Sequence, residues 1–191
     1  MKKPRYIALT DISTAIEVDD RQSLIRLLLY SNEIQIEGLI AVTSCFLKNG
    51  AKKHNENIIH SIINKYKCVR NNLLIHDENY PSSDYLHSVA ARGINAFGKS
   101  VGNGFCEEKY FKNSGVRLII DAVDKEESPL YIGLWGGANT LAQAIWTAEK
   151  EKSENEFNNF LSKIHIYSIS DQDYAGKWIR DTYANKLVYI V

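Results

Sequence analysis

Residues 6–11 read Tyr6-Ile7-Ala8-Leu9-Thr10-Asp11, a short apolar run that ends in a hydroxyl and a carboxylate. Such a run, bounded by breakers, is typical of a buried strand in a parallel sheet. After a loop, two further carboxylates, Asp19 and Asp20, stand at the start of the leucine-rich segment 20–31, which predicts a helix. The stretch therefore predicts a strand, a loop and a helix, with acidic side chains at both ends of the loop.

The rest of the chain repeats this alternation of strand and helix patterns. Further strands are expected at 34–42, 130–135, 164–169 and 187–191, and further helices at 49–66, 82–92, around 116–123, 139–152 and 175–183. The alternation predicts an α/β fold with a Rossmann-like, mostly parallel sheet, helices on both faces and right-handed crossovers. No linker divides the chain, so we expect residues 1–191 to form a single domain. Because Val191 falls inside an expected buried strand, we also expect the C-terminal part of that domain to be missing.

The composition limits the classes of partner. The chain has 191 residues, of which 45% are hydrophobic, and 23 basic side chains balance 23 acidic ones. A net charge of zero argues against a nucleic-acid partner. No stretch approaches the ~20 apolar residues of a membrane-spanning helix, so a membrane partner is not expected either.

The N-terminus and the cysteines indicate a cytoplasmic protein. The apolar run 6–9 is too short for the core of a signal peptide, although an export signal upstream of Met1 stays open. Cys45, Cys68 and Cys106 are widely spaced, which indicates free thiols and neither a disulfide framework nor a zinc site.

The ligand of an open parallel sheet lies beyond the carboxyl ends of its strands. This rule directs attention to Asp11 at the end of the first strand and to Asp19 and Asp20 at the start of the first helix. Carboxylates ~4 Å apart repel by roughly 4 kcal/mol at an effective dielectric of 20, so such a cluster must be partly protonated, spread apart or neutralised. Oxygen ligands suit Ca²⁺ or Mg²⁺. Alternatively, Asp19 and Asp20 only stabilise the helix N-terminus, an interpretation that leaves Asp11 unexplained.

Two other loops follow expected strands. Residues 135–140 read Trp135-Gly136-Gly137-Ala138-Asn139-Thr140, which is either a structural turn with a helix cap or a turn that directs the Trp135 carbonyl into the site. The second loop carries Asp171 and Asp173, which either cap the helix at Ala175 or bind sugar hydroxyls.

Three motifs in this order carry a family resemblance over nearly the whole chain. They are Thr10-Asp11-Ile12 with Val18-Asp19-Asp20-Arg21-Gln22-Ser23-Leu24, then Trp135-Gly136-Gly137-Ala138-Asn139-Thr140-Leu141-Ala142-Gln143-Ala144, and Tyr167-Ser168-Ile169-Ser170-Asp171-Gln172-Asp173. Together they resemble the nucleoside-hydrolase-like domain of the family labelled cellulose-binding. That family is similar in turn to inosine/uridine-preferring nucleoside hydrolases.

The resemblance implies a Ca²⁺ ion that holds the nucleophilic water and the sugar hydroxyls. By matching position, Asp11 would be a Ca²⁺ ligand and the general base, and Asp20 a bidentate ligand. The Trp135 backbone carbonyl would be a further ligand, and Asp19 would bind a sugar hydroxyl. Asn139, Asp171 and Asp173 are the other residues expected to contact substrate. The loop at Ser13 departs from the glycine-rich turn of nucleoside hydrolases, and their C-terminal aspartate and histidine have no counterpart here.

The predicted function is therefore hydrolysis of a glycosyl bond, N-glycosyl above all, by a Ca²⁺-bound water. The partner would be a small nucleoside or carbohydrate. One alternative is a non-catalytic carbohydrate-binding domain whose mid-chain aromatic residues stack on sugar rings. They are Tyr80, Tyr85, Phe97, Phe105 and Tyr110. Another is an incomplete gene product without activity of its own. An exposed sheet edge would also permit a homo-oligomer.

Overall fold

The computed structural model describes residues 2–13, 18–47, 56–96 and 106–191. Strands β1 to β6 span Arg5–Thr10, Gln35–Ala41, Ala90–Arg92, Leu130–Leu134, Ile164–Ser168 and Val188–Ile190. Helices α1 to α7 span Val18–Leu29, Glu56–Leu73, Ser83–Ser88, Ser114–Lys125, Asn139–Glu151, Glu154–Ser162 and Ala175–Tyr183, and a 3₁₀ turn, η1, covers Glu108–Tyr110. The strands form one sheet in the order β3-β2-β1-β4-β5-β6, and every neighbouring pair is parallel. The predicted α/β class is confirmed.

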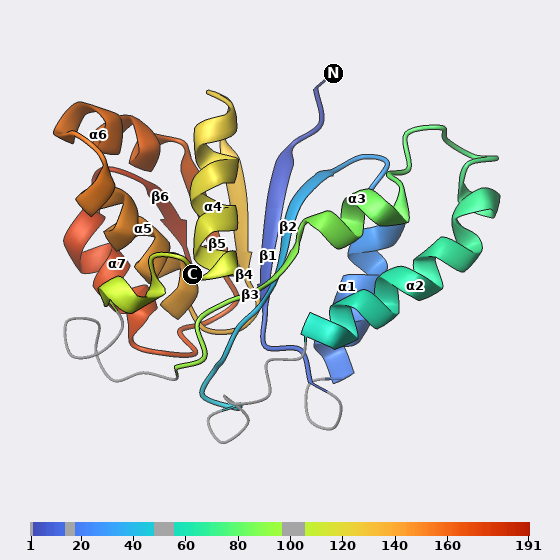
Figure 1. Cartoon of the computed structure of the whole chain (residues 1–191), viewed down its shortest axis with the longest axis horizontal. Helices are drawn as coiled ribbons and strands as arrows, with labels where there is room; N and C mark the ends of the chain where they lie inside the picture. The colour runs from blue at the N-terminus through green and yellow to red at the C-terminus, as the bar shows by residue number, and fades with distance from the viewer. Residues whose placement is uncertain (1, 14–17, 48–55, 97–105) are drawn as a thin grey trace.

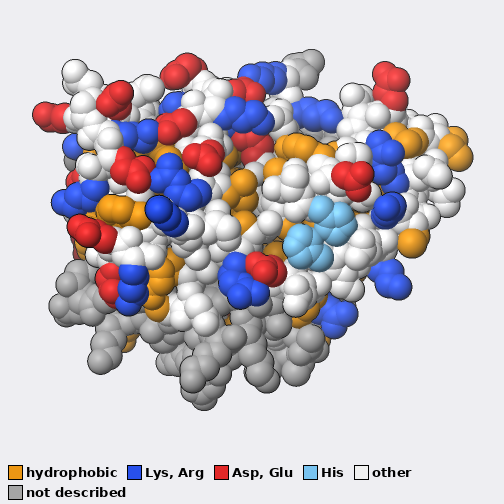
Figure 2. Space-filling view, in the orientation of Figure 1, with side chains coloured by type: hydrophobic (Ala, Val, Ile, Leu, Met, Phe, Trp, Pro, Cys, Tyr) orange, Lys and Arg blue, Asp and Glu red, His pale blue; other side chains and the backbone are white. Residues whose placement is uncertain are grey.

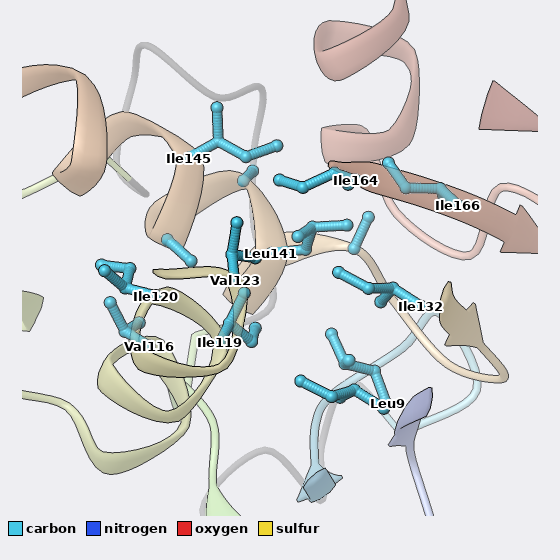
Figure 3. Close-up of a cluster of buried hydrophobic side chains, with 14 of the residues drawn as sticks. Leu9, Val116, Ile119, Ile120, Val123, Ile132, Leu141, Ile145, Ile164 and Ile166 are labelled. Atoms are coloured by element: carbon cyan, nitrogen blue, oxygen red, sulfur yellow. The ribbon is translucent and has the colours of Figure 1, made fainter. Parts of the chain in front are cut away.

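Helices cover both faces of this sheet, as predicted. Figure 1 shows α1, α2 and α3 on one side of the strands and α4, α5 and α7 on the other. The two layers bury separate hydrophobic clusters, and the larger one joins α4 and α5 to the strands (Figure 3). None of the helices in the described residues is long and apolar enough to cross a membrane. Figure 2 shows basic and acidic side chains interspersed on one face, in keeping with the balanced charge.

The spacing of apolar residues explains how the helices pack. In α4, Val116, Ile119, Ile120 and Val123 follow helical spacing and are buried, so one stripe of the helix faces the sheet. The Asn113 side chain starts this helix by accepting a hydrogen bond from the Val116 N–H at 3.1 Å. The order and type of the longer elements could thus be predicted from the pattern alone.

Two predicted boundaries were wrong. Helix α2 continues to Leu73 and does not end at Tyr66, while the expected start of that helix at Asn49 lies outside the described residues. Helix α3 ends at Ser88, because the next residues pair with β2 as the short strand β3. Alanine has the highest helix propensity, but propensity is a weak determinant, and pairing with β2 overrides it at 90–92.

Helix α6 was not predicted from the sequence. Its start is a capping box, in which the Ser153 side chain accepts from the Glu156 N–H and the Glu156 carboxylate accepts from the Ser153 N–H. This helix buries three side chains in the larger hydrophobic cluster: Phe157, Phe160 and Leu161. The Ser-x-x-Glu pattern followed by these apolar residues was a usable signal.

One half of the sheet has an uncovered face. On the side of α1, the strands β4 to β6 expose Tyr131, Tyr167, Val188 and Ile190, each between 44% and 59% exposed. Their strand register places them in adjacent rows, with Tyr131 beside His165 and His165 beside Val188. Strand β6 is also a sheet edge. An exposed sheet edge of this kind can pair with a second chain, so association into a homo-oligomer stays a prediction.

A buried ion pair fixes the amino end of the central strands. Arg5 and Glu37 are 1% and 3% exposed, and the Arg5 Nη2 lies 2.5 Å from the Glu37 Oε2. The register of β2 with β1 skips Glu37, so this bulge turns its carboxylate toward Arg5. Arg5 also donates to the carbonyls of Ala122 and Ser128, which ties the end of α4 and the start of β4 to the same point.

We predict that breaking this pair costs far more stability than replacing it. Glu37→Gln should lower the free energy of unfolding by about 3–5 kcal/mol, because it leaves the Arg5 charge buried without a counter-charge. Arg5→Met combined with Glu37→Leu should cost much less than the sum of the two single substitutions. Urea denaturation of the four variants, Glu37→Gln, the two single substitutions and their combination, measures both effects, and additive losses in the combination would contradict the prediction.

Candidate functional site

The loops that follow β1, β2, β4 and β5 meet at the carboxyl edge of the sheet. The Leu9 carbonyl in β1 accepts from the N–H groups of Trp135 and Gly136, at 2.8 and 3.2 Å. The Gly137 N–H donates to the Thr43 carbonyl at 2.8 Å, and the Cys45 N–H donates to the Gln172 carbonyl at 2.7 Å. These bonds hold four sequence-distant segments together.

Asp11 is the buried acid at the centre of this edge. Asp11 is 1% exposed, and neither carboxylate oxygen has a donor at hydrogen-bond geometry among the described residues, although the Ser44 hydroxyl acts on the carboxylate from nearby. Burial raises the pKa of Asp11 above its ordinary value. The Ser44 hydroxyl and the Asp11 backbone act in the opposite direction, and the charge of Asp19 adds to the rise in this pKa. A buried carboxylate without partners is costly, which marks this position as unusual.

Asp19 and Asp20 occupy different environments in the first turn of α1. Asp20 is 6% exposed and accepts a hydrogen bond from the Thr10 hydroxyl, so it is tied to the end of β1. Asp19 is exposed and lines a groove beside the helix. Among the described residues, no group of three acidic, histidine or cysteine side chains is placed to hold a metal ion. The three carboxylates therefore do not form a metal site without other donors.

The turn after β4 depends on its two glycines. A Cβ on Gly136 would lie 2.9 Å from the Cβ of Asp11, and one on Gly137 would lie 2.6 Å from the Thr43 carbonyl oxygen. Glycine thus lets this turn approach Asp11 closely. The Trp135 carbonyl, the predicted cation ligand, accepts a hydrogen bond from the Gln172 amide nitrogen at 2.6 Å. A carbonyl oxygen has a second lone pair, so this bond leaves one position for another partner.

Two amide oxygens at this edge are also buried without a partner among the described residues. They are the Oδ1 of Asn139 and the Oε1 of Gln172. The nitrogen of each amide is engaged, that of Asn139 by the Ala96 carbonyl at 2.7 Å. Asn139 was predicted to contact substrate, whereas Gln172 was not among the predicted site residues. The position of Gln172 just beyond β5, between two aspartates, was the available signal.

Asp171 and Asp173 make contacts within the protein. Asp173 is 9% exposed and accepts from the N–H groups of Asn139 and Ala175, at 3.1 and 2.9 Å, so it links the starts of α5 and α7. Burial raises the pKa of Asp173, while those backbone donors counteract the rise. Asp171 accepts two hydrogen bonds from Arg180, which lower the pKa of that carboxyl. Contact of either residue with a substrate stays a prediction.

A groove opens beside the acidic residues. It has a volume of about 390 Å³, and its walls include Asp19, Asp20, Trp135 and Gln172. Asp11 is not one of its walls; it is buried and packed against Gly136. The carboxylates of Asp19 and Asp20 belong to residues in the walls, whereas the Asp11 carboxylate oxygens are buried.

Comparisons with known proteins agree with this architecture. Residues 5–191 match the family described as "Cellulose-binding Sde182, nucleoside hydrolase-like domain". A solved structure of a nucleoside hydrolase-related hypothetical protein from Saccharophagus degradans, described as associated with carbohydrate metabolism, is 35% identical with a TM-score of 0.85. The similarity covers 97% of this chain and 43% of that one, so the chain spans less than half the length of this relative. Curated proteins gave no match.

The unpartnered Asp11 predicts a pH-dependent stability difference in a chelating buffer. The pKa of Asp11 is raised on folding, so its carboxylate destabilises the fold progressively as the pH rises above the ordinary aspartate value of about 3.9. Asp11→Asn should therefore be more stable than the parent at pH 7, by ~1 kcal/mol or more, and equally stable near pH 3. Urea unfolding across pH tests this, with the exposed Asp121→Asn as a matched control. A destabilised Asp11→Asn at pH 7 would contradict it.

We predict that Asp173 contributes chiefly to the stability of the fold. Asp173→Ala removes the acceptor of two backbone N–H groups at the starts of α5 and α7, so we expect a loss of about 1–3 kcal/mol. Thermal or urea unfolding measures the loss. Asp171→Ala, whose carboxylate is paired with Arg180 near the surface, should cost less than 1 kcal/mol. Equal losses of stability in Asp173→Ala and Asp171→Ala would show that the buried carboxylate of Asp173 contributes no more to the fold than that of Asp171.

Proposed function

Since the chain belongs to the nucleoside hydrolase-like domain family of cellulose-binding Sde182 proteins, we propose that it hydrolyses a glycosyl bond with a cation held at Asp11. The observation that carries this proposal is the Asp11 carboxylate, buried and without hydrogen-bond partners among the described residues. A buried charge normally has a counter-charge or a full set of donors. A cation would supply that compensation.

The oxygen atoms at this edge of the sheet are of the kind that a hard cation binds. Asp11, the Trp135 carbonyl and the amide oxygens of Gln172 and Asn139 offer oxygen donors, the type that Ca²⁺ takes in sets of six to eight together with water. No thiol or histidine is needed at this edge, so the set does not resemble a zinc site. Asp20 would add charge from the start of α1.

The residues of the chain have distinct parts in the proposed reaction. A bound Ca²⁺ would lower the pKa of a water molecule and orient it. An Asp11 carboxylate oxygen would accept the proton of that water. Asp19, exposed in the groove, would accept a hydrogen bond from a sugar hydroxyl. The nearby negative charge would stabilise the oxocarbenium-like sugar in the transition state.

Binding of carbohydrate without turnover is the second candidate function. The family description includes cellulose binding, and two of the expected cation ligands already have internal partners. Thr10 donates to Asp20, and Gln172 donates to the Trp135 carbonyl. Retention of the protein on insoluble cellulose, without release of sugar, would favour this candidate.

We predict that Ca²⁺ raises the thermal stability of the chain through Asp11. At a concentration 100-fold above the Kd, binding to the native state adds about 2.7 kcal/mol, which corresponds to a Tm increase of roughly 5–10 °C for a chain of this size. Asp11→Asn should abolish the increase, and Asp121→Asn should retain it. Differential scanning calorimetry with Ca²⁺ and with a chelator measures the change.

Activity is tested separately with a nitrophenyl riboside and with cellulose-derived sugars. The Ca²⁺-loaded chain should release the leaving group, and Asp11→Asn should lower the rate by about 10²–10⁴-fold. A Tm that does not change when Ca²⁺ is added would overturn the cation mechanism. A Ca²⁺-dependent Tm without turnover of any substrate would select the binding candidate.

A further inference from the structure

We propose that Thr10 is a positioning residue, whose buried hydroxyl holds the Asp20 carboxylate and the turn at Asp11 in the arrangement that a cation requires. The inference rests on the proposed function, because it concerns the same cation site. It is carried by two hydrogen bonds of one hydroxyl group, which join the end of β1 to the turn that follows it and to the start of α1.

The backbone and the side chain of Thr10 both have a defined orientation. Thr10 is the last residue of β1 and is fully buried, and its carbonyl accepts a hydrogen bond from the Val42 N–H at 2.8 Å. The strand register pairs it with Ala41 of β2. Because the side chain is β-branched, its χ1 rotamer is restricted as well. The hydroxyl oxygen therefore has a fixed direction relative to the sheet.

The partners of this hydroxyl define where its single proton points. The Thr10 Oγ1 accepts a hydrogen bond from the Ile12 N–H at 3.2 Å, and the hydroxyl donates its proton to the Oδ1 of Asp20. An ionised carboxylate can only accept hydrogen bonds, so the bond to Asp20 must run in this direction. The hydroxyl is thus a donor toward the acid and an acceptor toward the backbone.

The bond from Ile12 encloses Asp11. A threonine hydroxyl that accepts from the N–H two residues further along closes a short turn, and Asp11 is the residue inside this one. The turn after β4 packs against the same residue, because a Cβ on Gly136 would lie 2.9 Å from the Asp11 Cβ. The Thr10 hydroxyl therefore restricts the backbone from which the buried Asp11 side chain projects.

The bond to Asp20 gives two adjacent carboxylates different environments. Neighbouring residues of an α-helix point roughly 100° apart, so Asp19 and Asp20 cannot both face the end of β1. Asp20 is buried and bonded to Thr10, whereas Asp19 is exposed and lines the groove. A carboxylate offers about four lone-pair positions, so one hydrogen bond can orient a carboxylate that also binds a cation.

Such a bond matters for affinity because it fixes the orientation of a ligand before the cation binds. Groups that hydrogen-bond to metal ligands restrict the rotation of those ligands, and their loss typically lowers metal affinity about 10–100-fold. Thr10 is bonded to the carboxylate of one expected ligand and to the turn that carries the other. Its removal should therefore act on two ligands at once.

Calorimetric titration of the full chain with Ca²⁺ tests this inference. Thr10→Val removes the hydroxyl and nearly keeps the shape of the side chain, and it should raise the Kd for Ca²⁺ about 10–100-fold. Thr10→Ser keeps the hydroxyl and should restore most of the affinity. Thr147→Val, the same change at a fully buried threonine of α5, is the matched control and should leave the Kd unchanged.

A further variant covers the case in which Thr10→Val does not fold. Thr10→Cys keeps a side chain of similar size, but its thiol is a weaker donor than a hydroxyl. We expect its Kd for Ca²⁺ to lie between those of the parent and Thr10→Val, or clearly above that of the parent if Thr10→Val cannot be measured. An unchanged Kd in Thr10→Cys would contradict the inference in that case.

The outcomes distinguish this inference from the proposed function. If the parent and Thr10→Val bind Ca²⁺ equally, or Thr10→Ser loses as much affinity as Thr10→Val, the inference is wrong and the proposed function is unaffected. A lower Tm of Thr10→Val in chelator with an unchanged Kd has the same meaning, because it shows only a structural link. If the parent binds no Ca²⁺, the cation mechanism fails and the inference fails with it.

Discussion

The parallel pairing of β1 with both β2 and β4 is the constraint on which the candidate site depends. Because all three strands run in one direction, their following loops must emerge at the same edge of the sheet. The Leu9 carbonyl then serves as the anchor for the turn after β4, through the N–H groups of Trp135 and Gly136. A one-residue slip of β1 would turn its side chains to the opposite face of the sheet and displace Asp11, which directly follows this strand.

The two ends of the sheet differ in whether their buried charges are compensated. At the amino end, the Arg5–Glu37 pair is compensated and surrounded by further donors and acceptors. At the carboxyl end, Asp11 has no such partner among the described residues. The first arrangement fixes the packing of α4 against the strands, whereas the second costs stability. This contrast supports the candidate site independently of any relative.

Sequence reasoning succeeded where a local pattern has one structural meaning. Apolar runs with flanking breakers predicted β1, β2, β4 and β5, and the strand-end rule then placed Asp11 and Trp135 at one edge. It failed at β3, whose three residues become a strand only by pairing with β2. The sequence could not reveal that Asp173 links two helices or that the oxygen of Gln172 stays without a partner, because both facts depend on side-chain geometry between distant segments.

The hydrogen bonds at the carboxyl edge also constrain how a cation could enter. Thr10 holds one oxygen of Asp20, and the Gln172 amide nitrogen holds the Trp135 carbonyl. Both bonds join groups that the proposed site would use, so binding must either exchange them or use the second lone pair of each oxygen. The amide of Gln172 is suited to this exchange, since its free oxygen lies on the same side chain as the nitrogen that occupies the carbonyl. In the proposed cation-bound state, a rotation of this amide would release the carbonyl and turn the oxygen toward the cation, so Gln172 is the side chain that we expect to rearrange on binding.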